Sequence, residues 1–266
     1  MSVWKEYFVY SASFPSLSSG GSTPGQIFTT YETRIDPDSD FEFAKTAFMP
    51  VHGRARIQYR DDTSGRFLMK GSPDLRTIGG TSLYTMAPAD ISLAPGFLPF
   101  IWPIPYIIPA AATLTVSASN LLGVTYNLQI AFHGSKIRPG VAPWDRNFRA
   151  RMPYVYSLSS SGTVSVPANG STTVSIATDI DSHFLIHKIT GVRAGQCLVT
   201  FKDSRDRQWT DQPLQFDNIV GNGHFPNILS SPRFIARGSV ITVTIQDISG
   251  SANVVELDFV GVKLFE

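Results

Sequence analysis

Cysteine, charge and uninterrupted apolar runs are all scarce in this chain of 266 residues. Cys197 is the single cysteine, so no disulfide can form within the chain and the fold depends on burial and hydrogen bonding. Charged residues make up 16% of the sequence, against about a quarter in ordinary soluble proteins. The net charge of +1 provides no attraction toward nucleic acid or an anionic membrane, so we expect neither as a partner.

The longest apolar stretch, residues 93–109, is interrupted by prolines, which break helical geometry and remove backbone donors. It therefore cannot cross a membrane as a helix. The N-terminus has no basic region followed by an apolar core, so we expect no secretory signal. The sequence also lacks the G-x-S-x-G, P-loop and G-x-G-x-x-G motifs, and we expect a protein that is not an enzyme and binds no cofactor.

What the sequence does contain is repetition. Residues 36–45 and residues 179–188 both follow the pattern D-x-D-S-x-F-x-x-x-K. Further matches keep the same order along the chain, with offsets that drift by small insertions. They pair F-V-Y-S (8–11) with Y-V-Y-S (154–157), A-R-I-Q-Y-R-D (55–61) with C-L-V-T-F-K-D (197–203), and F-H-G-S-K (132–136) with F-V-G-V-K (259–263). This order indicates two copies of one domain, at residues 1–140 and 141–266, joined by a stiff proline-containing segment.

Within each copy, apolar and polar residues alternate with a period of two. Ala55, Ile57 and Tyr59 alternate with polar residues, and Cys197, Val199 and Phe201 do the same in copy two. One apolar face per strand is typical of half-buried antiparallel sheets, and no stretch has a convincing helical period. We therefore predict an all-β protein of two tandem antiparallel β-sandwich domains of the same, jelly-roll-like fold.

The repeated aspartates and the histidines could suggest metal sites. An EF-hand loop starting at Asp36 would need glycine and a carboxylate where Phe41 and Ala47 stand, so we expect a turn rather than calcium. His183 and His187 would lie roughly 13 Å apart on a strand, too far to share a zinc ion. Cys197 is expected to be a small buried hydrophobe. We predict no metal site and no catalytic residue.

The main difference between the copies is an insertion. Copy one carries 15 more residues between Phe67 and Pro105, and this apolar, proline-rich insertion falls near residues 88–109. Two interpretations stay open: a loop folded over the open end of its own sandwich, or an arm that covers a neighbouring subunit. The N-terminal aromatic residues are a second candidate for such contacts. The predicted interface residues are Trp4, Tyr7, Phe8, Phe97, Phe100, Ile101, Trp102 and Tyr106.

Several of these segments resemble a known group of proteins. F-V-Y-S, the D-x-D-S-x-F-x-x-x-K pattern, P-x-x-I-P-A-x-A-T-L-T-V around residues 105–116 and I-A-F-H-G-S-K at 130–136 together resemble virion structural proteins of tailed bacteriophages. The resemblance implies a non-enzymatic, multimeric component of the virion whose partners are other virion proteins and further copies of itself. A head decoration or minor capsid protein is the first expectation, and a neck or tail accessory protein is the second.

A carbohydrate- or receptor-binding module is the rival class, because sandwiches often present aromatic rings to sugars. Trp209 aligns with Phe67 and is expected in the core, which leaves Trp4 and Trp102 as possible platforms for a glycan. A binding module would expose Trp102 at the rim of a polar groove. A building block would bury it, in its own fold or against another chain.

Overall fold

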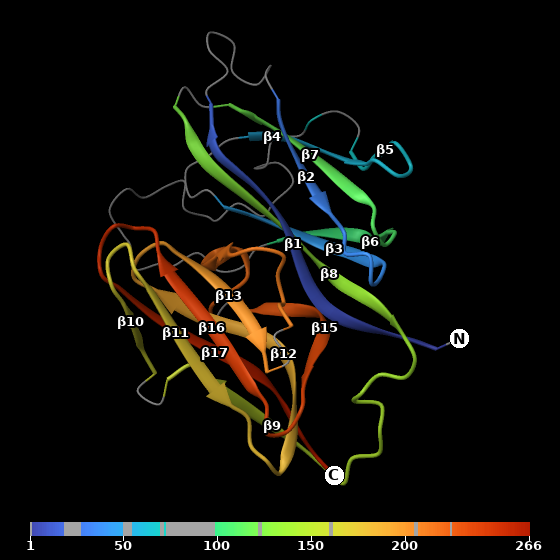
Figure 1. Ribbon diagram of the computed structural model, residues 1–266, viewed down its shortest axis with the longest axis vertical. Helices are drawn as coiled ribbons and strands as arrows, with labels where there is room; N and C mark the ends of the chain where they lie inside the picture. Colours follow the sequence, from blue (N-terminus) through green and yellow to red (C-terminus); the bar gives the residue numbers. More distant parts are fainter. Residues whose placement is uncertain are drawn as a thin grey trace. The chain divides into compact units, whose positions relative to one another are not determined.

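A computed structural model shows a protein made almost entirely of β-strands (Figure 1). The structure describes residues 2–18, 28–49, 55–69, 72, 99–121, 124–159, 162–204, 207–223 and 225–266. Its one short helical element among these residues is the 3-10 turn η2 (Phe216–Asn218). No helix in the described part of the chain has the length and apolar character needed to span a membrane.

The chain divides into two compact units. Of the described residues, unit 2 comprises 9–18, 28–49, 55–69, 72, 99–121 and 124–137, and unit 1 comprises 2–8, 138–159, 162–204, 207–223 and 225–266. Residues 2–8 therefore group with the C-terminal part of the chain, although the sequence repeat had assigned residues 1–140 to a single domain.

Unit 2 contains two four-stranded antiparallel sheets. One has the order β1-β8-β3-β6 and the other the order β2-β7-β4-β5. The strands are β1 (Val3–Leu17), β2 (Thr29–Arg34), β3 (Phe41–Met49), β4 (Ala55–Asp61), β5 (Arg66–Phe67), β6 (Phe100–Ile108), β7 (Thr113–Asn120) and β8 (Tyr126–Pro139). The start of β1, through Phe8, and the end of β8, from Arg138, belong to unit 1. Strand one pairs with eight, two with seven, three with six and four with five, which is the nested pairing of a jelly roll.

Unit 1 has the same scheme with one strand divided. Its sheets have the orders β10-β17-β12-β15 and β11-β16-β13-β14, and β9 also pairs with β17. The strands are β9 (Ala150–Ser157), β10 (Val164–Val166), β11 (Ser171–Ala177), β12 (Ser182–Arg193), β13 (Cys197–Asp203), β14 (Leu214–Gln215), β15 (Asn227–Ile235), β16 (Val240–Asp247) and β17 (Asn253–Phe265). Because β9 and β10 pair with successive parts of β17, they occupy together the place that β1 holds in unit 2.

A matching irregularity marks the third strand of each unit. The register shifts between Phe43 and Lys45 in β3, and between Ile186 and Lys188 in β12, on both neighbouring strands. Gly134 of β8 pairs beside the first bulge and Gly261 of β17 beside the second. A Cβ atom on either glycine would collide with a backbone carbonyl oxygen of the bulged strand. Glycine at these two positions thus lets the strands approach where the ladder is distorted.

The alternating residues of the sequence form the core as predicted. Ala55, Ile57 and Tyr59 of β4 are fully buried, and Cys197, Val199 and Phe201 of β13 are at most 2% exposed. Aromatic rings occupy the interior of each sandwich. In unit 2, Phe43, Tyr59, Phe132 and Trp102 pack edge to face or tilted, and in unit 1 Phe201, Trp209 and Phe259 form the equivalent group.

Candidate functional site

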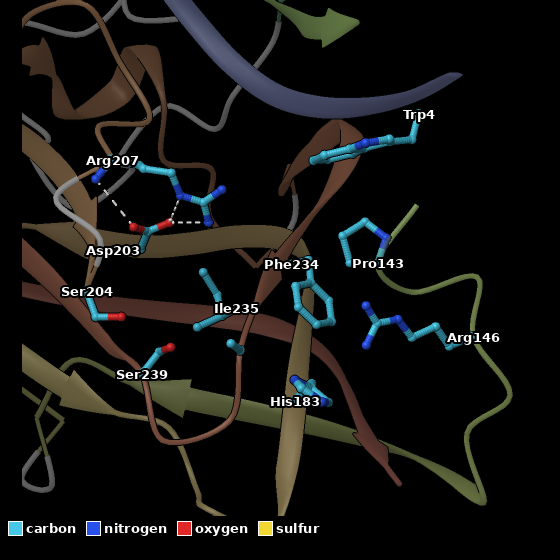
Figure 2. A pocket seen from close by; sticks show the side chains of 11 residues that line it. Trp4, Pro143, Arg146, His183, Asp203, Ser204, Arg207, Phe234, Ile235 and Ser239 are labelled. Carbon is cyan, nitrogen blue, oxygen red and sulfur yellow. Dashed lines mark hydrogen bonds and ion pairs between the residues drawn. The ribbon is translucent and has the colours of Figure 1, made fainter. Parts of the chain in front are cut away.

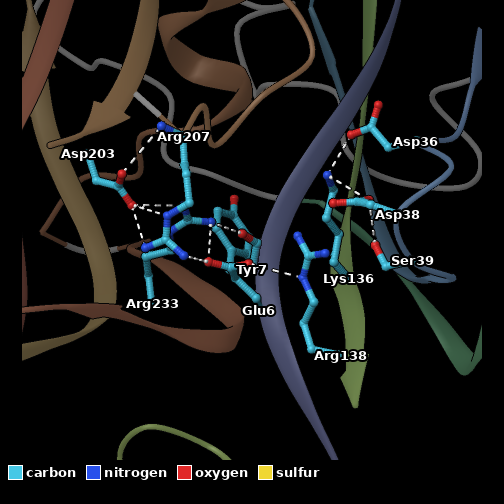
Figure 3. Close-up of polar contacts among 10 residues, drawn as sticks. All are labelled: Glu6, Tyr7, Asp36, Asp38, Ser39, Lys136, Arg138, Asp203, Arg207 and Arg233. Atoms are coloured by element: carbon cyan, nitrogen blue, oxygen red, sulfur yellow. Dashed lines mark hydrogen bonds and ion pairs between the residues drawn. The ribbon is translucent and has the colours of Figure 1, made fainter. Parts of the chain in front are cut away.

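The first D-x-D-S motif forms a lysine-centred ion pair in unit 2. Lys136 Nζ lies 2.5 Å from Asp36 Oδ2 and 3.5 Å from Asp38 Oδ1, and the Ser39 hydroxyl donates to Asp38 (Figure 3). The backbone N–H of Asp36 donates to the Tyr10 hydroxyl oxygen at 2.9 Å. The motif therefore ties the turn before β3 to strands β1 and β8, and its carboxylates are engaged by protein donors.

The second motif repeats these contacts in unit 1. Lys263 forms an ion pair with Asp179, and the backbone N–H of Asp179 donates to the Tyr156 hydroxyl oxygen at 3.1 Å. The hydrogen bond from Lys263 lowers the pKa of the Asp179 carboxyl. Lys263 also lies 3.6 Å from the centroid of the Tyr154 ring. The motif is a structural ion pair, and its lysine partner comes from the last strand of the unit, not from the lysine inside the motif.

The histidines and the cysteine have structural surroundings. His183 donates from Nε2 to Glu266 at 3.0 Å in the tautomer that leaves Nδ1 to accept from the backbone N–H of Arg237 at 3.2 Å, so both ring nitrogens are occupied. Burial raises the pKa of the Cys197 thiol to about 12. Among the described residues, no group of three or more histidine, cysteine, aspartate or glutamate side chains is arranged to hold a metal ion. His52 and His224 lie outside these residues.

Strand β6 presents an apolar surface at the edge of its sheet. Ile101, Ile104 and Ile107 are 65%, 79% and 53% exposed. β6 pairs with β3 through Tyr106 and Phe43 and then through Ile101 and Lys45, so the residues from Trp102 to Pro105 bulge out between the two contacts. Ile104 stands in this bulge between Pro103 and Pro105. The two prolines restrict the backbone and remove two N–H donors, which leaves a stiff apolar projection.

The structure locates the other predicted interface residues as follows. Trp102 is half-buried; its indole N–H donates to Thr46 at 3.3 Å, and its ring packs against Phe43 and Phe100 of unit 2. The Tyr106 hydroxyl donates to Asp61 at 2.8 Å. Tyr7 and Phe8 are buried, and Trp4 is half-buried. Phe97, with the first part of the insertion near 88–109, lies outside the described residues.

A buried charge network that no sequence pattern predicted binds the N-terminal segment into unit 1. Arg233 of β15 is 1% exposed and lies 3.3 Å from Glu6 and 3.5 Å from Asp203 (Figure 3). It also donates to the Tyr7 carbonyl oxygen at 2.9 Å, and its guanidinium lies over the Trp209 ring. Arg207 adds contacts to both carboxylates. Glu6 and Arg233 are far apart in sequence and have no repeat partner of the same type, so no pattern pointed to their contact.

A cavity of about 340 Å³ opens beside this network. Three parts of unit 1 contribute to its wall: the N-terminal segment, the segment before β9, and the strands and turns around β12, β13 and β15. Figure 2 shows the Trp4 ring above Phe234 and His183, with Pro143 and Arg146 on one side and Asp203 and Arg207 on the other. The lining residues are Trp4, Pro143, Arg146, His183, Asp203, Ser204, Arg207, Phe234, Ile235, Ala236 and Ser239.

The fold defines a protein of two jelly rolls, an architecture found in viral capsid proteins, lectins and cupins. No protein-family description matches the chain, and no curated protein matches its sequence. Among solved structures it is similar to the major capsid protein P2 of bacteriophage PM2, with 11% identity over 95% of this chain and 97% of that one and a TM-score of 0.25.

Two further solved structures show similarly low agreement. The VP2 subviral particle of infectious bursal disease virus has 9% identity, coverage of 99% and 82%, and a TM-score of 0.18. An oxalate decarboxylase of Bacillus subtilis has 11% identity, coverage of 87% and 68%, and a TM-score of 0.17. With TM-scores well below 0.5, none of these similarities supports a function for this chain.

Proposed function

We propose that this chain is a non-enzymatic structural component of a phage virion, a self-associating building block that decorates or cements the capsid. The observation that carries the proposal is the β6 edge, where Ile101, Ile104 and Ile107 expose apolar side chains on a strand held in place by β3. Large exposed apolar surfaces are uncommon on monomers and mark contacts with other chains. A neck or tail accessory protein of the virion would use the same surface.

The arrangement of the two sandwiches supports a structural role. Aromatic rings fill their interiors, and the repeated D-x-D-S motifs are occupied by lysines that hold strands together. Trp102 packs against Phe43 and Phe100 within its own unit but is only half-buried, so its exposure favours neither a building block nor a sugar-binding groove. We also propose that the units are duplicated copies of one domain, since their strand orders, bulges and aspartate–lysine pairs correspond.

The expected mode of association is side-chain packing and not strand addition. Pro103 and Pro105 remove backbone donors from the bulge, so another strand cannot continue the ladder through it. Ile104 can instead insert into an apolar depression of a neighbouring copy at little cost in backbone entropy. Full burial of one isoleucine side chain contributes about 2 kcal/mol.

Replacing Ile104→Asp tests the proposal. We expect the purified wild-type chain to form an oligomer, measured by analytical ultracentrifugation, and the variant to associate at least tenfold more weakly while its circular dichroism is unchanged. Ile180→Asp is the matched control, because Ile180 is 84% exposed but belongs to unit 1 and lies outside β6. A monomeric wild type, or equal association of both variants, would contradict self-association through β6. Absence of the protein from purified phage particles would contradict the virion role.

A further inference from the structure

The cavity of unit 1 has the features of a small-molecule site. Its volume of about 340 Å³ lies at the lower end of the range of ligand pockets, enough for one or two ring-sized groups. Trp4 and Phe234 contribute aromatic walls, and Ser204 and Ser239 contribute hydroxyl groups. A pocket that combines flat apolar surfaces with a few polar groups suits a ring-shaped, oxygen-rich ligand.

The two arginines of the cavity differ in their partners. Arg207 is neutralised by Asp203 at 2.7 Å and by Glu6 at 3.3 Å. Among the described residues, Arg146 forms no hydrogen bond or ion pair within 4 Å, but its charge acts on the Glu266 carboxylate and contributes to the lowered pKa of that group. Its guanidinium points toward Phe234 and His183 in Figure 2. It therefore offers its full set of donors to a ligand anion. A planar guanidinium binds a carboxylate through two parallel hydrogen bonds.

His183 does not compete for this role, because Glu266 and the backbone N–H of Arg237 occupy both of its ring nitrogens. It instead packs against Phe234, with ring centroids 5.0 Å apart, and so helps to fix that wall of the cavity. Trp4 is fixed in a similar way by an edge contact with Trp144 at 5.6 Å. Both aromatic walls are thus held in place by neighbouring rings.

We propose that this cavity binds an acidic sugar unit, a hexuronate at the end of or within a polysaccharide. The carboxylate would pair with Arg146, the C–H face of the ring would lie against Trp4, and the serine hydroxyls would bond sugar hydroxyls. An acidic peptide fits less well, because a buried peptide backbone needs hydrogen-bond partners along its length. This binding activity is additional to the structural role proposed above and does not depend on it.

Calorimetry with the full chain tests the proposal, using glucuronate- and galacturonate-containing oligosaccharides and their neutral counterparts. We expect saturable binding of at least one acidic oligosaccharide, at least tenfold weaker for its neutral counterpart and for Arg146→Gln, and reduced at high salt. Arg146 is exposed, so its replacement leaves the fold intact. Trp4→Leu should weaken binding and abolish any change in tryptophan fluorescence on saturation.

Arg151→Gln is the matched control, since Arg151 of β9 is also exposed but does not line the cavity. Its affinity should equal that of the wild type. Absence of saturable binding to every acidic oligosaccharide, equal affinity for acidic and neutral sugars, or an Arg146→Gln variant that binds as well as the wild type would each overturn the proposal. Preferential binding of a poly-glutamate peptide would also overturn it, because the ligand class would be wrong.

Discussion

At the scale of single residues, polar side chains in this protein fasten strands together. The Lys263 ammonium is largely shielded from solvent, with its side chain 8% exposed, whereas Asp179 is 45% exposed. Solvent screening of the half-exposed carboxylate reduces the contribution of this ion pair to the free energy of unfolding. We expect a double-mutant cycle with Asp179→Asn and Lys263→Met to give a coupling free energy of about 1 kcal/mol at neutral pH.

The same pair should respond to acid in a defined direction. Lys263 lowers the pKa of Asp179 below its ordinary value, so the folded state holds this proton less tightly than the unfolded state does. The stabilisation is therefore complete well above pH 4 and is lost as the pH falls through the lowered pKa. Chemical denaturation of the four proteins of the cycle should show the full coupling near pH 7 and a progressively smaller coupling as the pH falls through the acid range below about 4. A coupling that persists in acid would contradict this assignment.

Cys197 should be inert in the folded protein. The thiol is 2% exposed, and burial raises its pKa to about 12, so very little thiolate is present at pH 8. An aromatic disulfide reagent should label less than a tenth of the protein in an hour without denaturant and all of it in guanidinium chloride. Rapid stoichiometric labelling of the native protein would mean that β13 opens readily or that the thiol is accessible.

At the scale of elements, the two bulges make a sharp prediction about glycine. A Cβ atom on Gly261 would collide with the Leu185 carbonyl oxygen. The atoms in the way belong to the backbone of β12, so no side chain can rotate to relieve the clash. We expect Gly261→Ala to lower the free energy of unfolding by about 2–3 kcal/mol, as overpacking does in cores. Gly223→Ala is the control, since nothing lies within 4 Å of its Cβ position, and it should change stability by less than about 0.5 kcal/mol. Equal stability of the two variants would show that the bulge can relax.

Strand identity could be predicted from the sequence wherever one face is apolar. The alternation of Ala55, Ile57 and Tyr59, and of Cys197, Val199 and Phe201, predicted buried faces that the structure confirms. The alternation in β8 was less informative, because Leu128 to Lys136 are all buried, on both faces of the strand. Strand β6 gave no such signal, since its prolines and bulge break the period of two. β6 is identified as a strand by its pairing with β3, and the sequence alone does not show which strands pair.

The candidate sites were harder to predict than the strands. The sequence left Trp4 and Trp102 as possible platforms for a glycan, but nothing in it distinguished Trp4, which lines a cavity, from Trp102, which packs against Phe43. Trp102 lies beside Tyr59 in unit 2 as Trp209 lies beside Phe201 in unit 1, yet the repeat aligns Trp209 with Phe67, which is 56% exposed. The same interior position is thus filled from different segments, and matched positions do not guarantee matched roles.

At the scale of the whole molecule, unit 1 is built from both ends of the chain. Glu6 and Tyr7 belong to it although they precede all of unit 2 in sequence, and Arg233 links them to β15. The Arg233 guanidinium is buried and depends on Glu6 and Asp203 for its compensating charge. Removing one partner of a buried charge network commonly costs 3–5 kcal/mol because the remaining charge stays desolvated.

We therefore expect Glu6→Gln to destabilise unit 1 selectively. The loss should be about 3 kcal/mol, since Asp203 still neutralises part of the charge. Hydrogen exchange read by mass spectrometry should show faster exchange in residues 3–8 and in β15, while β3 and β4 of unit 2 keep their protection. Glu32→Gln, at an exposed position of β2, is the matched control and should leave both regions unchanged. Equal loss of protection in both units would mean that they unfold as one cooperative body, and no loss in either would mean that Glu6 does not hold the N-terminal segment.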